Sequence, residues 1–221
     1  MIRISYLAMA VALAICPIGC FNTKTTTGSA TQPSEHDRLF VEGTELIAPY
    51  MTLQRGTRKD PRSSGARRDI IEGIHKLEQV IAINAKNWSA FWFIGKGYQV
   101  LGDSERAYAS FKSAWDLHKQ DSNVAREFML ACLALGRGSE GVAIAEHALK
   151  LKPKDPGLTA NLALALLIDG QLDRAEHEVR ESLAIDPEDS VTQELETTIS
   201  DIKNGKRSRP MKLGDLAGAT P

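Results

Sequence analysis

Residues 88–121 carry the stretch that decides the fold, WSAFWFIGKGYQVLGDSERAYASFKSAWDLHKQD. Its spacing recurs downstream at an interval of 34 residues. That interval separates three glycines and three aspartates: Gly102, Gly136 and Gly170, and Asp121, Asp155 and Asp189. A period of 34 on a helical pattern indicates stacked helix-turn-helix units, because one such unit cannot bury its apolar face without a neighbour. The sequence therefore predicts an all-α solenoid.

Residue types within the repeating units also follow a fixed order. In residues 88–121 the marker positions hold Phe91, Ile94, Gly95, Tyr98, Ala107, Phe111 and Ala114. This order resembles the tetratricopeptide repeat (TPR) family, although Lys119 stands where that family usually has Pro. Residues 122–155 and 156–189 match less closely by residue but keep the period without a gap, and they have the Pro, at 153 and 187. The resemblance implies three TPR repeats over residues 88–189.

The region before these repeats, residues 35–87, reads as a degenerate repeat. Residues 35–53 and 69–83 have apolar residues at helical spacing, and Pro49 is expected to kink or shorten the first of these helices. Between them, residues 54–68 form a basic loop that is an expanded turn. The loop is either a solvated connection or a contact with anionic lipid headgroups.

Two segments follow the repeats. Residues 190–205 have one narrow apolar face and one charged face, which is typical of a terminal capping helix. Residues 206–221 are short of large apolar residues, so we expect a disordered tail. Its candidates for docking onto the repeats are Met211, Leu213 and Leu216.

The first twenty residues have the composition of an export signal. Arg3 precedes an apolar run from residue 4 to residue 15, which is short for a membrane span of about 20 residues. The pair Gly19-Cys20 resembles the end of a bacterial lipobox, whose Cys becomes the lipidated first residue, although Pro17 departs from that pattern. The sequence thus predicts a signal peptide at residues 1–20, lipidation at Cys20 and a flexible tether at 21–34. An uncleaved N-terminal membrane anchor and ordinary secretion are the alternatives.

Residues that could carry chemistry are sparse. The net charge of −1 is not the excess of positive charge that is typical of nucleic-acid-binding proteins. The five histidines lack partners at metal-ligand spacing, and no phosphate loop or nucleophile elbow occurs. Cys132 falls at a packing position, where a buried, inert thiol is expected, and the acidic residues read as solvated side chains on helix surfaces. We therefore expect no enzyme, no cofactor and no metal.

The TPR resemblance implies a concave groove lined by the first helix of each repeat. The inward positions would be Trp92, Lys96, Gln99, Val100, Arg126, Leu130, Leu133, Leu164, Leu167 and Ile168. Only Lys96 and Arg126 suit the family's clamp for a peptide carboxylate, so that clamp is not expected. The groove becomes apolar toward Ile168, and apolar patches of this kind are rarely left open to water.

Several occupants could cover this apolar part. The chain's own C-terminal helix or tail could fold back, two copies could pair, or an exported protein partner could insert an apolar segment against Trp92. The predicted function is a non-catalytic protein-interaction scaffold, exported and anchored to the membrane by lipid, that assembles or tethers cell-envelope proteins and faces the periplasm. The alternatives are a module for a hydrophobic non-protein ligand (a lipid or a glycan) and a self-associating structural protein.

Overall fold

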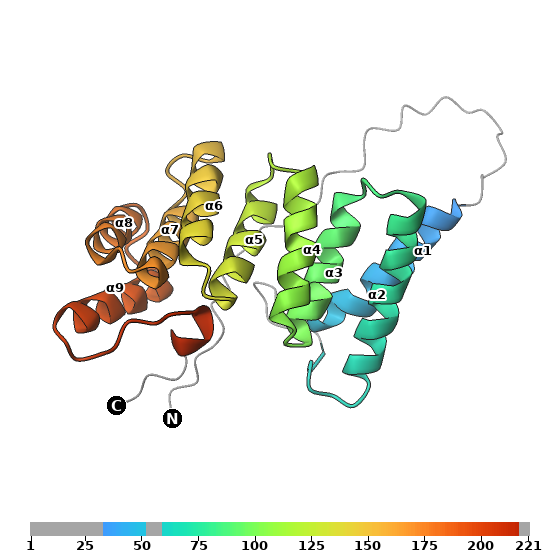
Figure 1. The fold of residues 1–221 in the computed structure, drawn as a ribbon, viewed down its shortest axis with the longest axis horizontal. Coiled ribbons are helices and arrows are strands. Elements are labelled where there is room, and N and C mark those ends of the chain that lie inside the picture. The colour runs from blue at the N-terminus through green and yellow to red at the C-terminus, as the bar shows by residue number, and fades with distance from the viewer. Residues whose placement is uncertain (1–32, 52–58, 217–221) are drawn as a thin grey trace.

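The structure, a computed structural model, describes residues 33–51 and 59–216 (Figure 1). The predicted export signal, Cys20 and most of the tether lie outside the described residues, as do 52–58 of the basic loop and 217–221. Within the described ranges the chain forms nine α-helices, two short 3-10 helices and no strand, which confirms the all-α prediction. The helices are α1 (Glu35–Ile47), α2 (Ala66–Ile83), α3 (Trp88–Val100), α4 (Ser104–Leu117), α5 (Ser122–Ala134), α6 (Gly138–Leu151), α7 (Pro156–Asp169), α8 (Leu172–Ile185) and α9 (Ser190–Lys203). The 3-10 helices are η1 (Ala48–Tyr50) and η2 (Leu213–Leu216).

The helices stack in one row, and each α-helix packs against the one before it (Figure 1). Three connected apolar clusters fill the spaces between them. The first joins α1, α2 and α3, the second is centred on Phe111 and Phe128, and the third joins α5 to α9 around Leu133 and Leu166. Because each cluster is built from neighbouring helices, burial depends on stacking, as in a solenoid.

The residues that repeat every 34 positions lie at helix boundaries. Asp121, Asp155 and Asp189 are the N-caps of α5, α7 and α9, and each carboxylate accepts a hydrogen bond from a backbone N–H of the following turn. Gly102, Gly136 and Gly170 follow α3, α5 and α7 with φ of +76°, +72° and +89°, a left-handed conformation that ends a helix and that other residues adopt at a cost. The period thus marks where each first helix starts and ends.

Helices α1 and α2, in the segment that the sequence predicts to be a degenerate repeat, pack as a pair. The first helix stops at Ile47 because Pro49, in η1, lacks the N–H that another helical turn would need. The second helix begins at Ala66, three residues before the start that the sequence predicts.

Residues 206–216 differ from the disordered tail that the sequence predicts. Beyond Gly205 the chain turns back along the solenoid and ends in η2, which lies against α5 (Figure 1). Leu213 and Leu216 pack against the third cluster. Composition alone missed this segment, because two leucines are enough when a complementary apolar surface is already folded beside them. We call residues 206–216 the C-terminal strap.

Candidate partner-binding surface

The predicted groove residues lie on α3, α5 and α7, the first helices of the three repeats, but the structure divides them into two sets. One set is reached by solvent, with an exposed Gln99 and four residues of intermediate burial: Trp92, Val100, Arg126 and Leu130. We call these five residues the open surface. The other set, the covered surface, is buried: Leu133, Leu164, Leu167 and Ile168. Lys96, predicted to face a partner, is also buried.

Lys96 belongs to an ion network that joins α3 to α5. Its Nζ lies 3.1 Å from Oε2 of Glu127, and the guanidinium of Arg126 lies 3.0 Å from Oε1 of the same carboxylate. The side chains of Lys96, Glu127 and Arg126 are 10%, 6% and 11% exposed. Burial alone would raise the pKa of Glu127, but the two cations outweigh it and hold the pKa below its ordinary value. The predicted partner-binding cations therefore pair with a buried carboxylate within the fold, and the network carries one net positive charge.

Aromatic side chains line the open surface at its α3 end. Trp92 meets Phe93 edge-on with ring centroids 5.0 Å apart, and Phe93 meets Phe40 of α1 edge-on at 6.0 Å. The Nζ of Lys96 lies 5.8 Å from the centre of the Trp92 ring. These half-buried rings extend the candidate site onto the degenerate repeat.

The sequence-based groove omitted Phe93, Glu127 and Asn161, although a signal for them exists. They are 34 residues apart and so hold the same position in successive repeats. Asn161 on α7 is 4% exposed, and its Nδ2 has no hydrogen-bond partner within the described residues. Glu127 and Asn161 are polar residues at a repeat position surrounded by apolar ones. This pattern in the sequence would have predicted that both are buried polar groups.

The C-terminal strap lies against the cluster that contains the covered surface. Leu213 and Leu216 pack against the cluster that contains all four of its residues. Arg209 donates a hydrogen bond to the carbonyl oxygen of Ile168 at the end of α7, and a Cβ built on Gly136, after α5, would lie 3.0 Å from the Met211 carbonyl oxygen. The sequence allowed several occupants for the apolar part of the groove. The structure shows one of them, the chain's own C-terminal segment, beside this part.

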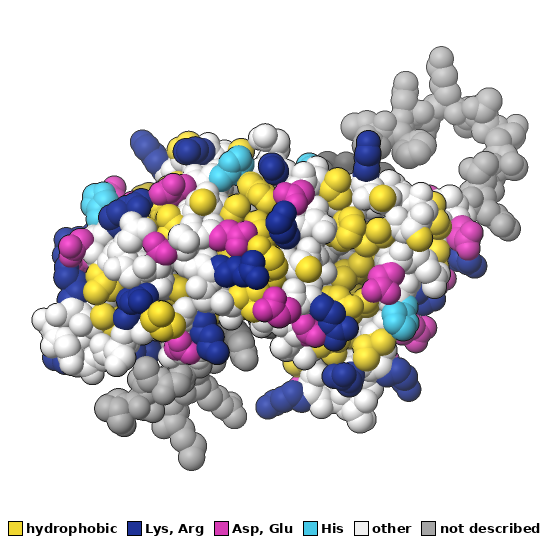
Figure 2. Space-filling view, viewed as in Figure 1, with side chains coloured by type: hydrophobic (Ala, Val, Ile, Leu, Met, Phe, Trp, Pro, Cys, Tyr) yellow, Lys and Arg dark blue, Asp and Glu magenta, His cyan; other side chains and the backbone are white. Residues whose placement is uncertain are grey.

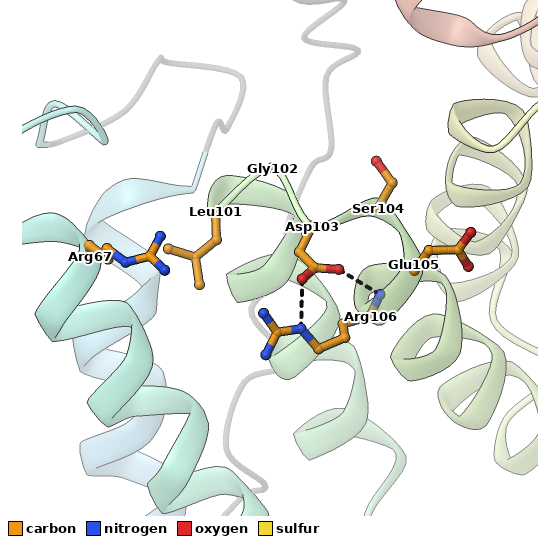
Figure 3. Close-up of a pocket in the computed structure, with 7 residues that line it drawn as sticks. All are labelled: Arg67, Leu101, Gly102, Asp103, Ser104, Glu105 and Arg106. Carbon is orange, nitrogen blue, oxygen red and sulfur yellow. Dashed lines mark hydrogen bonds and ion pairs between the residues drawn. The ribbon is translucent and has the colours of Figure 1, made fainter.

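The turn after α3 lacks such a covering. A Cβ built on Gly102 would meet no atom within 4 Å. Figure 3 shows the depression at this turn, of about 370 Å³, lined by Arg67 and residues 101–106. Asp103 there accepts hydrogen bonds from the backbone N–H and the Nε of Arg106, which lower its pKa. A second depression, of about 320 Å³, lies between α8 and α9.

Neither depression is lined by the predicted groove residues. On the face drawn in Figure 2, hydrophobic side chains are interspersed with charged ones and form no broad apolar area. Among the described residues, no three His, Cys, Asp or Glu side chains are grouped as metal ligands. Cys132 is fully buried, and burial raises the pKa of its thiol to about 12, so it is protonated at neutral pH.

Comparison with known proteins places the fold. No protein-family model and no curated protein matches the chain. Among solved structures, MamA from Desulfovibrio magneticus RS-1 is 15% identical, with a TM-score of 0.61 over 79% of this chain and 88% of that one. A tetratricopeptide repeat protein from Parabacteroides merdae is 11% identical, with a TM-score of 0.62 over 77% and 61%. YrrB, a TPR protein with an unusual peptide-binding site, is 14% identical, with a TM-score of 0.55 over 68% and 76%.

At these identities the likeness concerns the fold alone. It agrees with the helix pairs, with the 34-residue period and with the marker residues at the positions that TPR repeats use. The chain has the helical-repeat fold of tetratricopeptide-repeat proteins.

Proposed function

We propose that this chain is a non-catalytic scaffold that binds a protein partner along the open surface. The observation that carries the proposal is the row of half-buried rings, Phe40, Phe93 and Trp92, which adjoins exposed Gln99 on the first helices of the repeats. Aromatic side chains that are partly buried in the free protein lose little conformational entropy when a partner covers them, and they dominate the binding energy of many interfaces.

An extended segment or a helix of a protein fits this surface better than a small molecule does. Small ligands are usually held in enclosed apolar cavities, whereas the depression at the Gly102 turn is lined by the charged side chains of Arg67, Asp103, Glu105 and Arg106. The similarity in fold to YrrB, described as having a peptide-binding site, supports the same class of partner.

We also propose that the protein is exported and lipid-anchored at Cys20, where it assembles or tethers cell-envelope proteins. The support is the signal-like composition of residues 1–20. Within the described residues no helix combines the length and apolar character that crossing a bilayer requires. A Cys20→Ser change is expected to move the protein out of the membrane fraction. Unaltered fractionation would refute lipid anchoring and favour the uncleaved anchor.

The binding proposal is tested by a pull-down with a Trp92→Ala, Leu130→Asp double variant of the full chain. Partners identified by mass spectrometry with the wild type are expected to be lost, because the variant removes one anchor and places a charge on the open surface. Leu117→Asp is the matched control, since Leu117 is 41% exposed on α4, a second helix of the array. The proposal fails if the double variant retains every partner that the control retains.

A further inference from the structure

We propose that the C-terminal strap is an internal competitor of the partner. It occupies the covered surface within its own chain and leaves when a partner segment of the same chemistry binds there. The inference rests on the proposed function, because the partner that binds the open surface would continue onto the adjoining covered surface. It names the chemistry of that second part of the partner. The partner's segment would have an arginine followed by leucines four and seven residues later, the same spacing as Arg209, Leu213 and Leu216 in the strap.

The strap contacts the repeats through hydrogen bonds from two arginines and through two leucines. Arg207 donates to the Oγ1 of Thr198 in α9 at 3.3 Å. Arg209 donates to the carbonyl oxygen of Ile168, at the C-terminal end of α7, where the partial negative charge of the helix attracts a cation. Leu213 and Leu216 cover apolar side chains of the third cluster, and η2 lies against α5. The contacts of Arg209, Leu213 and Leu216 use only main-chain oxygen and apolar surface, so another segment with the same spacing can make them.

Hydrogen bonds within the strap shape the turn that leads into η2. The Oδ2 of Asp215 accepts hydrogen bonds from the backbone N–H groups of Met211 and Lys212, at 2.9 and 3.1 Å. The backbone N–H of Asp215 in turn donates to the Lys212 carbonyl oxygen at 3.1 Å. An aspartate that closes its own turn restricts the backbone of residues 211–215, so a segment with the same turn loses less conformational entropy when it docks.

The attachment is weak compared with that of the helices. Pro210 is the one buried residue among the described residues 206–216; no residue of η2 is buried, and Met211 is 60% exposed. At the base of the strap, the Nε of Arg207 is buried without a hydrogen-bond partner within the described residues. Burying an unpaired donor is unfavourable, and release of the strap removes that penalty because water then reaches the atom. Segments with few buried contacts are the first to open in a folded protein.

A partner can gain contacts that the strap lacks. The strap passes two of three equivalent turns, with Arg209 beside Gly170 and Met211 beside Gly136. The third turn, at Gly102, is uncovered and holds the depression in Figure 3. A longer segment that continues in the same direction reaches this turn, and only such extra contacts shift the equilibrium away from the bound strap.

The test measures binding of a fluorescent peptide with the sequence of residues 206–216 to the full chain, by anisotropy. A Leu213→Asp, Leu216→Asp variant releases the strap. A Gly136→Cys, Lys212→Cys variant locks it, because a Cβ built on Gly136 lies 3.9 Å from the Lys212 Cβ, within the range of about 3.5–4.5 Å that disulfides require. The lock is made with Cys16 and Cys20 changed to Ser, and Cys132 remains buried.

If the strap is closed about nine-tenths of the time, its release tightens peptide binding about tenfold. The oxidised lock is expected to abolish binding, and reduction to restore it. Equal affinities of wild type, released variant and oxidised lock would overturn the proposal, as would absence of binding to the released variant.

Two glycine variants provide a second test without charged substitutions. Gly136→Ala and Gly102→Ala introduce similar strain, at φ of +72° and +76°, but only the Cβ at position 136 meets the strap. Faster hydrogen exchange in residues 206–216 is expected for Gly136→Ala alone, because its Cβ would lie 3.0 Å from the Met211 carbonyl oxygen. Equal exchange in the two variants would refute the contact of the strap with this turn. These assays use only the purified chain and a peptide, so their outcome is independent of the pull-down. The strap proposal can be refuted while the pull-down supports partner binding on the open surface, and the pull-down can fail while these assays support the strap proposal.

Discussion

Removal of the Glu127 carboxylate tests how α3 and α5 are held together. Glu127 is the only acidic partner of Lys96 and of Arg126 among the ion pairs of the described residues. In a Glu127→Ala variant two cations, 10% and 11% exposed, would face each other without compensation. Breaking a buried pair by removing one partner costs about 3–5 kcal/mol. For a folded region of this size that corresponds to a fall in Tm of about 6–20 °C.

Two variants make the measurement specific. Asp116→Ala removes the carboxylate of the exposed Lys112–Asp116 pair and is expected to cost about 0.5 kcal/mol or less. A triple variant, Lys96→Met, Arg126→Leu and Glu127→Met, replaces the network with apolar side chains and is expected to be within a few kcal/mol of wild type or more stable. Thermal melts followed by circular dichroism compare the four proteins. A Glu127→Ala Tm no lower than that of Asp116→Ala would refute the role of this network.

The same network predicts the sign of a pH dependence. The folded-state pKa of Glu127 lies below the ordinary value of 4.5, so the unfolded chain binds its proton more readily. The stabilisation by Glu127 is therefore fully present above about pH 4.5 and is lost as the pH falls through the folded-state pKa. Wild type is expected to lose stability in this range faster than the triple variant does.

Three further predictions concern a helix cap, a thiol and the strap. Asp155→Ala removes the side-chain acceptor for the Leu158 N–H and is expected to cost about 1 kcal/mol in denaturant unfolding, whereas Asp186→Ala, at a C-cap without such a bond, changes stability little. In a Cys16→Ser, Cys20→Ser background, Cys132 is expected to resist alkylation at pH 8 in the native state and to react once unfolded, because its pKa is about 12; rapid native labelling would contradict its burial. Arg209→Ala removes a contact to the α7 terminus worth about 1 kcal/mol, so hydrogen exchange in residues 206–216 is expected to rise about fivefold while exchange in α1 stays unchanged.

The sequence predicted the solenoid well because its period marks helix boundaries. Asp155 and Gly170 recur for local reasons, a capping side chain and a left-handed backbone, and local requirements can be read from one sequence. The candidate site was predicted less well because burial depends on contacts between distant segments. Glu127 looked like one more surface carboxylate, and only the fold brings Lys96 beside it.

The strap shows that order, like burial, depends on contacts between distant segments. A segment with few large apolar residues is expected to be disordered when it is considered alone. Leu213 and Leu216 are ordered because α5 and α7, some 40 to 90 residues earlier in the chain, present the surface that they cover.

The most direct test of the central claim is a comparison of two photo-crosslinking positions in cells. A photoreactive amino acid at Gln99 stands on the open surface, and one at Lys112 is exposed on α4, a second helix. We predict that Gln99 gives a discrete adduct with one protein, which the Trp92→Ala, Leu130→Asp variant abolishes, and that Lys112 gives none. Equal adducts at both positions, or an adduct at Gln99 that survives the double variant, would contradict partner binding along the first helices.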